Sequence, residues 1–146
     1  MQIKLWCATI SLALFSWWLL PSQVQAPGDA SGNWHGTWTA PEGWNYQAAM
    51  KLAVSHDQVQ GEIHWTLKAS PRPSDQSKIG LTGIEHVKGT FVPSCGVVLM
   101  EGVSLDDPNH ILGVDKYRLI LSDDGRVLGG ITWHRGAWTA QFLLQR

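Results

Sequence analysis

The chain is poor in cysteine, with only Cys7 and Cys95 in 146 residues. Cys7 lies in an N-terminal segment that we expect to be removed, so the sequence predicts no internal disulfide and a fold that depends on its hydrophobic core. Cys95 falls in the turn Pro93-Ser94-Cys95-Gly96 between two expected strands. There the thiol is accessible, either as a tolerated free cysteine or as the link that would join two chains in a dimer.

The chain also has no large excess of positive or negative charge. Eleven lysines and arginines stand against twelve aspartates and glutamates, which gives a formal net charge of −1 with neutral histidines. No run of either sign occurs along the chain. The composition therefore indicates neither a nucleic-acid partner nor an anionic membrane surface.

The familiar catalytic spacings are absent as well. The chain has no Gly-x-Ser-x-Gly elbow, no His-Glu-x-x-His pair and no phosphate-binding glycine loop. These absences favour a protein that is not an enzyme, and we predict no cofactor and no metal. Asp106, Asp107, Asn109, His110 and Asp115 do gather oxygen and imidazole ligands, but Asp-Asp-Pro-Asn is typical of a turn, the interpretation that we favour.

Only one long hydrophobic run is present, from residue 5 to residue 20. It follows Lys4 and ends at Pro21 and Ser22, and the small-residue exit Val24-Gln25-Ala26 comes next. This pattern is typical of a signal peptide over residues 1–26, and the run is short for an uncleaved spanning helix. We expect residues 27–146 to form one domain, secreted or periplasmic, with no stable membrane anchor after cleavage.

Alternating apolar and polar residues dominate the remainder, and no stretch has a helical period. A glycine recurs two positions from large apolar residues, in Trp34-x-Gly36-x-Trp38, Val59-x-Gly61-x-Ile63-x-Trp65, Val87-x-Gly89-x-Phe91 and Val127-x-Gly129-x-Ile131-x-Trp133. A spacing of two places these residues on one face of a strand, and glycine marks bends or room for a bulky neighbour. The expected strands cover residues 33–39, 45–54, 58–67, 84–92, 96–104, 114–122, 126–133 and 137–145. Short turns between most of them predict an all-β, eight-stranded antiparallel up-and-down barrel, a meander.

The indoles define the candidate site. Trp34, Trp38, Trp65, Trp133 and Trp138 all fall in the register that we expect to face the barrel axis. They either plug the interior as core or line a cavity where a ligand binds. The sequence leaves both alternatives open.

Polar candidates lie near the ends of the expected strands. Glu85 is in phase with Val87 and should point inward near one barrel end, where it could orient a ligand or pair with an interior arginine or a tyrosine hydroxyl such as that of Tyr117. Two connections are long, residues 69–83 and residues 105–113, and loops of this kind often carry recognition. In the second loop we expect partner contacts at Asp106, Asp107, Asn109 and His110.

Gly36-Thr37-Trp38, on the first strand of a secreted eight-strand meander, resembles the opening strand of the calycins, the superfamily of lipocalins and avidins. The resemblance implies that Trp38 closes one barrel end and that the open end binds a small hydrophobic or amphipathic molecule. The chain departs from the family pattern because it lacks the usual lipocalin disulfide, a helix before the last strand and an avidin-like polar set for biotin.

These observations predict a small secreted binding protein that holds an apolar or aromatic ligand at the barrel mouth, gated by residues 69–83. The candidate ligand-binding residues are Trp38, Trp65, Glu85, Tyr117, Trp133 and Trp138. The alternative is a solid, ligand-free barrel that acts as a protein-interaction or inhibitor module through its loops.

Overall fold

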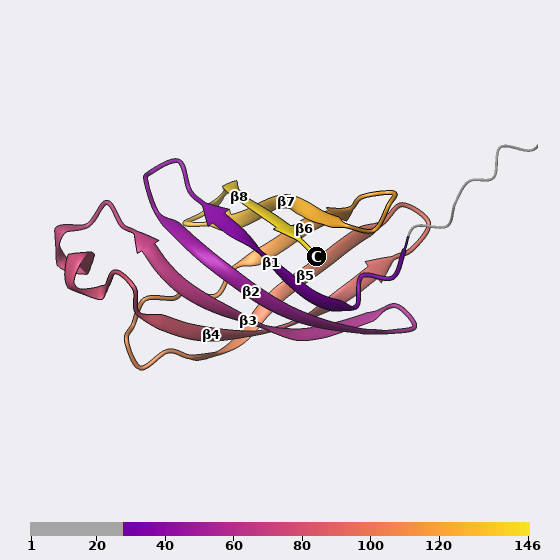
Figure 1. The fold of residues 1–146 in the computed structure, drawn as a ribbon, viewed down its shortest axis with the longest axis horizontal. Coiled ribbons are helices and arrows are strands. Elements are labelled where there is room, and N and C mark those ends of the chain that lie inside the picture. The colour runs from indigo at the N-terminus through magenta and orange to yellow at the C-terminus, as the bar shows by residue number, and fades with distance from the viewer. Residues whose placement is uncertain (1–27) are drawn as a thin grey trace, which may run out of the picture.

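The protein is an eight-stranded antiparallel meander that closes into a barrel (Figure 1). The computed structural model describes residues 28–146, so the expected signal peptide lies outside the described residues. The strands are β1 (Gly32–Thr39), β2 (Asn45–Ser55), β3 (Gln58–Ala69), β4 (Thr82–Val92), β5 (Val97–Asp106), β6 (Lys116–Leu121), β7 (Val127–His134) and β8 (Ala137–Gln145). Each begins and ends within two residues of its expected bounds, which confirms the predicted fold class.

Closure comes from the pairing of the first strand with the last. Gly36 of β1 lies opposite Leu144 of β8, and Trp38 lies opposite Phe142. No sheet edge is left open, and alternate side chains along the strands fill a single interior. Within the described residues this barrel holds no disulfide, and Cys95 is an exposed free thiol.

Glycine lets the wall curve where neighbouring backbones approach closely. A Cβ atom built on Gly36 or Gly89 would lie 1.9 Å from a carbonyl oxygen of the adjacent strand, and on Gly61 it would lie 2.1 Å away. These three predicted positions are confirmed. In β7 the glycine without room for a Cβ is Gly130, at 2.0 Å from the Arg118 carbonyl oxygen, and not the predicted Gly129.

The predicted inward register of β7 was wrong by one residue. Leu128 and Thr132 are fully buried in the barrel, whereas Trp133 is 38% exposed. Apolar residues stand on both faces of this strand, and glycine occupies adjacent positions 129 and 130. The alternation therefore carries no information about which face is inside.

A β-bulge also turns Trp138 away from the interior. Thr132 lies opposite Ala140 but Trp133 lies opposite Trp138, so one extra residue is accommodated in β8. The Trp138 ring packs edge-on against Trp133, with the Arg118 guanidinium 4.2 Å from its centroid. Both indoles thus lie on the outer surface, where the sequence had placed them inside.

One end of the barrel is closed by Trp34. Its ring is fully buried, its Nε1 donates to the Ala30 carbonyl oxygen at 3.0 Å, and the Arg146 guanidinium lies 4.4 Å from its centroid. Arg146 also donates to the carbonyl oxygens of Asp29 and Ser31. The resemblance assigned the closing role to Trp38, but the structure gives it to the tryptophan four residues earlier.

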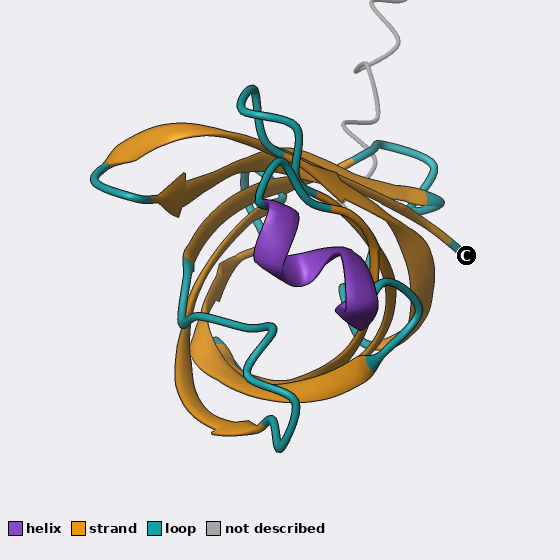
Figure 2. Ribbon diagram, turned by 90° about the vertical axis from the view of Figure 1, so that its left-hand side faces the viewer, coloured by secondary structure: helices purple, strands orange, loops and turns teal. Residues whose placement is uncertain are grey.

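The opposite end is covered by the connection between β3 and β4. The sequence indicated an irregular loop, whereas Pro73–Lys78 forms a short 3-10 helix, η1. Figure 2, a view onto this end, shows η1 crossing the barrel opening. The part of the chain that the structure describes contains no helix with the length and apolar character needed to span a bilayer.

Two adjacent glycines of β7 allow the curvature argument to be tested. We expect Gly130→Ala to lower the free energy of unfolding by about 1 to 3 kcal/mol, because its Cβ would collide with backbone that cannot move independently. Gly129→Ala should change it by less than about 1 kcal/mol, since its Cβ would meet only the tip of the exposed Leu143 side chain at 3.0 Å. Urea unfolding of both variants measures the difference, and equal losses would contradict the argument.

Candidate functional site

Beneath η1 the barrel holds a cavity of about 560 Å³. Its walls are the rings of Trp38, Trp44, Tyr46, Trp65 and Tyr117, and the loop of residues 110–115 and the β7–β8 turn complete it. The size lies in the ordinary range for small-molecule sites. Both alternatives for the indoles therefore hold, one at each end, because Trp34 plugs the barrel while Trp38 and Trp65 line an open space.

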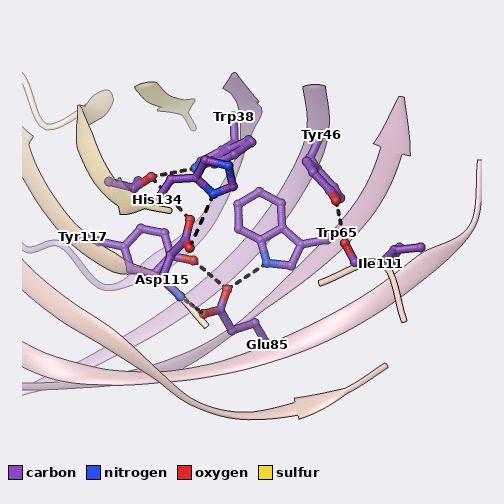
Figure 3. Close-up of polar contacts among 9 residues, drawn as sticks. Trp38, Tyr46, Trp65, Glu85, Ile111, Asp115, Tyr117 and His134 are labelled. Atoms are coloured by element: carbon purple, nitrogen blue, oxygen red, sulfur yellow. Dashed lines mark hydrogen bonds and ion pairs between the residues drawn. The ribbon is translucent and has the colours of Figure 1, made fainter. Parts of the chain in front are cut away.

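Glu85 lies at the deep end of this cavity and is 1% exposed (Figure 3). Its Oε2 accepts hydrogen bonds from the Tyr117 hydroxyl at 2.5 Å and from Trp65 Nε1 at 3.1 Å, and its Oε1 accepts one from the backbone N–H of Asp115 at 3.2 Å. Gly102 on β5 makes the room, since a Cβ there would lie 2.0 Å from Oε1. The predicted inward position of Glu85 and its pairing with Tyr117 are confirmed.

A second carboxylate, Asp115, adjoins the first. Trp38 Nε1 donates to Thr132 Oγ1 at 2.8 Å, and the Thr132 hydroxyl donates to Asp115 Oδ2 at 3.4 Å. His134 Nδ1 lies 3.9 Å from Asp115 Oδ1, too far for a hydrogen bond. This chain of contacts fixes the Asp115 side chain beside Glu85, facing the aromatic wall (Figure 3).

Burial makes both carboxyl groups reluctant to ionise. Loss of solvent, followed by the neighbouring Glu85 charge, raises the pKa of Asp115 to about 7. Burial likewise raises the pKa of Glu85, although its three hydrogen bonds oppose the effect. Near neutral pH the deep end of the cavity thus carries partial negative charge that responds to small changes of environment.

His134 and the two tyrosines of the cavity stay neutral near pH 7. Burial lowers the pKa of His134, whose ring packs edge-on against Trp38 with centroids 4.9 Å apart. Burial also raises the pKa of Tyr117 well above its ordinary value and that of Tyr46 to about 12. Both tyrosines therefore remain hydrogen-bond donors, with Tyr46 donating to the Ile111 carbonyl oxygen.

The mouth has the opposite charge. The guanidinium carbons of Arg135 and Arg72 lie 4.3 and 5.2 Å from the Trp44 ring centroid. Lys78 of η1 donates to the His110 carbonyl oxygen at 3.1 Å, which links the helix to the opposite loop. These three basic side chains outnumber the one acidic side chain of η1 that lines the cavity, Asp75, so the rim is basic and the floor is acidic.

Four of the six predicted ligand-binding residues line the cavity, namely Trp38, Trp65, Glu85 and Tyr117. Trp133 and Trp138 do not line it, because β7 has the other register and β8 contains the bulge. Of the predicted loop contacts, His110 alone lines the cavity. Within residues 28–146, no cluster of three His, Cys, Asp or Glu residues is arranged to hold a metal ion.

The remaining loop residues hold the chain in place. Asp107 Oδ2 accepts the backbone N–H of Leu112 at 2.7 Å, and Asn109 Nδ2 donates to the Thr82 carbonyl oxygen at 2.9 Å. Asp106 contacts His86 Nε2 at 2.8 Å on the outer surface. This agrees with the structural turn that the sequence favoured.

Sequence reasoning missed several members of the site. Asp115 had been grouped with the turn residues, although it directly precedes β6, two residues before the inward Tyr117. His134 follows Thr132 by two and would have been found had the register of β7 been correct. Tyr46 and Trp44 were not among the predicted site residues, since nothing in the sequence locates the void beside them.

Comparison of the chain with protein-family models, with curated proteins and with solved structures finds no match. The fold class of the protein is therefore defined by its structure alone. It is an all-β, eight-stranded up-and-down barrel with one end closed and an aromatic cavity at the other.

Asp115 should make stability depend on pH. A carboxyl group whose pKa is higher in the folded than in the unfolded chain binds extra protons when folded, so the free energy of unfolding falls as pH rises from about 4 to 7. At about 1.4 kcal/mol per pKa unit, this contribution is at most about 4 kcal/mol. We expect Asp115→Asn to be more stable than wild type above pH 7, with the gap closing toward pH 4.

Urea unfolding at pH 4.5, 6 and 7.5 measures this effect. Glu85 and His134 also titrate and are present in both proteins, so the difference reports Asp115 together with its electrostatic coupling to Glu85. Glu101→Gln on the outer surface of β5 is the control and should follow wild type, since this carboxylate has no ion pair or side-chain hydrogen bond within the described residues. A constant difference between Asp115→Asn and wild type across this range would contradict the assignment.

Proposed function

We propose that the protein is a small-ligand binding protein that holds an apolar or aromatic molecule in the cavity under η1. The single observation that carries this proposal is a space of about 560 Å³ walled by aromatic rings, with buried polar groups converging at its floor. Ligand sites have this composition, since apolar walls supply affinity and a few fixed polar groups supply orientation. In this proposal η1 is the gate.

The proposal extends to cellular context and ancestry. Residues 1–26 would direct export, which places the binding protein outside the cytoplasm, secreted or periplasmic. A closed barrel with a buried tryptophan at one end and a cavity at the other supports a calycin-like relationship. That relationship is an analogy of fold, so the ligand must be argued from the cavity itself.

The alternative, a protein-interaction or inhibitor module, has less support. A solid barrel would offer no cavity, and the polar side chains of Asp107 and Asn109 are already engaged by the chain itself. Pairing of two chains through the exposed Cys95 belongs to this alternative.

Tryptophan fluorescence tests the proposed function. We expect saturating N-phenyl-1-naphthylamine or 2-phenylethanol to change the intrinsic emission, because three indoles line the cavity. Trp44→Phe should reduce the amplitude of the change, since Trp44 lies at the mouth. Trp133→Phe is the matched control and should keep the full amplitude, since its ring is on the outer surface.

Two results would contradict the proposal. A response that survives Trp44→Phe and disappears in Trp133→Phe would place binding on the outer surface. An absent response across neutral, cationic and anionic apolar and aromatic probes would favour the interaction module.

A further inference from the structure

The floor of the cavity holds two carboxylates whose partners are neutral. Glu85 accepts from an indole, a phenol and a backbone amide, and Asp115 accepts from a hydroxyl. Within residues 28–146, neither carboxylate has a lysine or arginine nitrogen within 4 Å. Buried charges in proteins are normally paired, so any negative charge on these two carboxyl groups is one that no cationic side chain of the described residues balances.

The walls above these carboxylates are suited to positive charge. Trp38, Tyr46 and Trp65 stand in sequence along the cavity, with successive ring centroids 5.6 and 5.9 Å apart. Cations are attracted to the faces of such rings, most strongly to tryptophan. Trp44 already attracts the two rim arginines, whereas in the described part of the chain no lysine or arginine lies over the three deeper rings.

One further polar atom of the site has no partner. His134 lines the cavity, and its Nε2 is buried without a hydrogen bond in the described part of the chain. When the neutral ring carries its proton on Nδ1, the nitrogen that faces Asp115, Nε2 is an acceptor. An acceptor that is buried and unpaired is costly, so a donor supplied by a ligand would satisfy it.

We propose that the cavity binds a small organic cation, an ammonium group carried on an apolar or aromatic body, with the ammonium against Glu85 and Asp115. This inference rests on the proposed function and adds the charge of the ligand. The ammonium donates to the carboxylates, while the body packs against the aromatic wall that Trp38, Tyr46 and Trp65 form. A carboxylate ligand would instead meet two like charges at the floor.

Three probes of similar shape test the charge. Calorimetric titration at pH 7.5 compares 2-phenylethylamine, 2-phenylethanol and 3-phenylpropanoate. We expect the amine to bind at least about tenfold more tightly than the alcohol, the effect of one charge-assisted hydrogen bond, and the acid to bind most weakly.

Variants then assign the preference to the floor. Asp115→Asn should remove most of the amine preference and leave the affinity for 2-phenylethanol within about twofold, because only a charged ligand senses the lost charge. Glu85→Gln should do the same. Should that fully buried variant fail to fold, the partly exposed Asp115 still carries the test, and Glu62→Gln on the outer surface should behave as wild type.

The outcomes separate the two proposals. Equal binding of amine and alcohol would overturn the cation inference while leaving the small-ligand function intact, and so would tighter binding of 3-phenylpropanoate, directed by the basic rim. An amine preference that persists in Asp115→Asn and in folded Glu85→Gln would also overturn the inference. Failure of all three probes and of N-phenyl-1-naphthylamine to bind would defeat both.

Discussion

The pairing of β1 with β8 is the constraint on which the rest of this structure depends. It requires strands that coil tightly enough for backbone to touch backbone, as at Gly36, where a Cβ would lie 1.9 Å from the Leu143 carbonyl oxygen. Once the ring is closed, every strand has one face in a common interior and no edge can pair with another chain. Which residues become neighbours inside is then decided by register alone.

Closure also explains why the two ends differ. At one end Trp34 is fully buried, and Arg146 packs over its ring and binds the lead-in to β1, so side chains close the interior there. At the other end the strands run on into long connections, and polar side chains such as Glu85 can sit inside near the rim. In a barrel with one closed end and one polar end, only the few residues that line the polar end can contact a ligand inside.

Much of this fold could be predicted, because an alternation of period two and short turns are local signals. Strand bounds, the meander and the inward positions of Trp38 and Glu85 followed from them. The register of β7 did not, since Gly129 and Gly130 make its two faces equivalent, and the bulge that turns Trp138 outward depends on a neighbouring strand. The cavity could not be predicted either, because a void is set by how η1 and residues 110–115 settle over the rim.

Glu85 and Asp115 lower the stability of the folded barrel, because both carboxyl groups are largely buried. Their presence is therefore informative about the ligand. A core of this size would be more stable with apolar residues at both positions, since burial opposes ionisation and raises both pKa values. The structure nevertheless surrounds Glu85 with three donors and clears space for it at Gly102. These hydrogen bonds orient the carboxylates, but no cationic side chain of the described residues pairs with either of them. A cationic ligand would pair with these carboxylates, and the free energy that burial of unpaired charge costs the protein would be recovered as binding free energy.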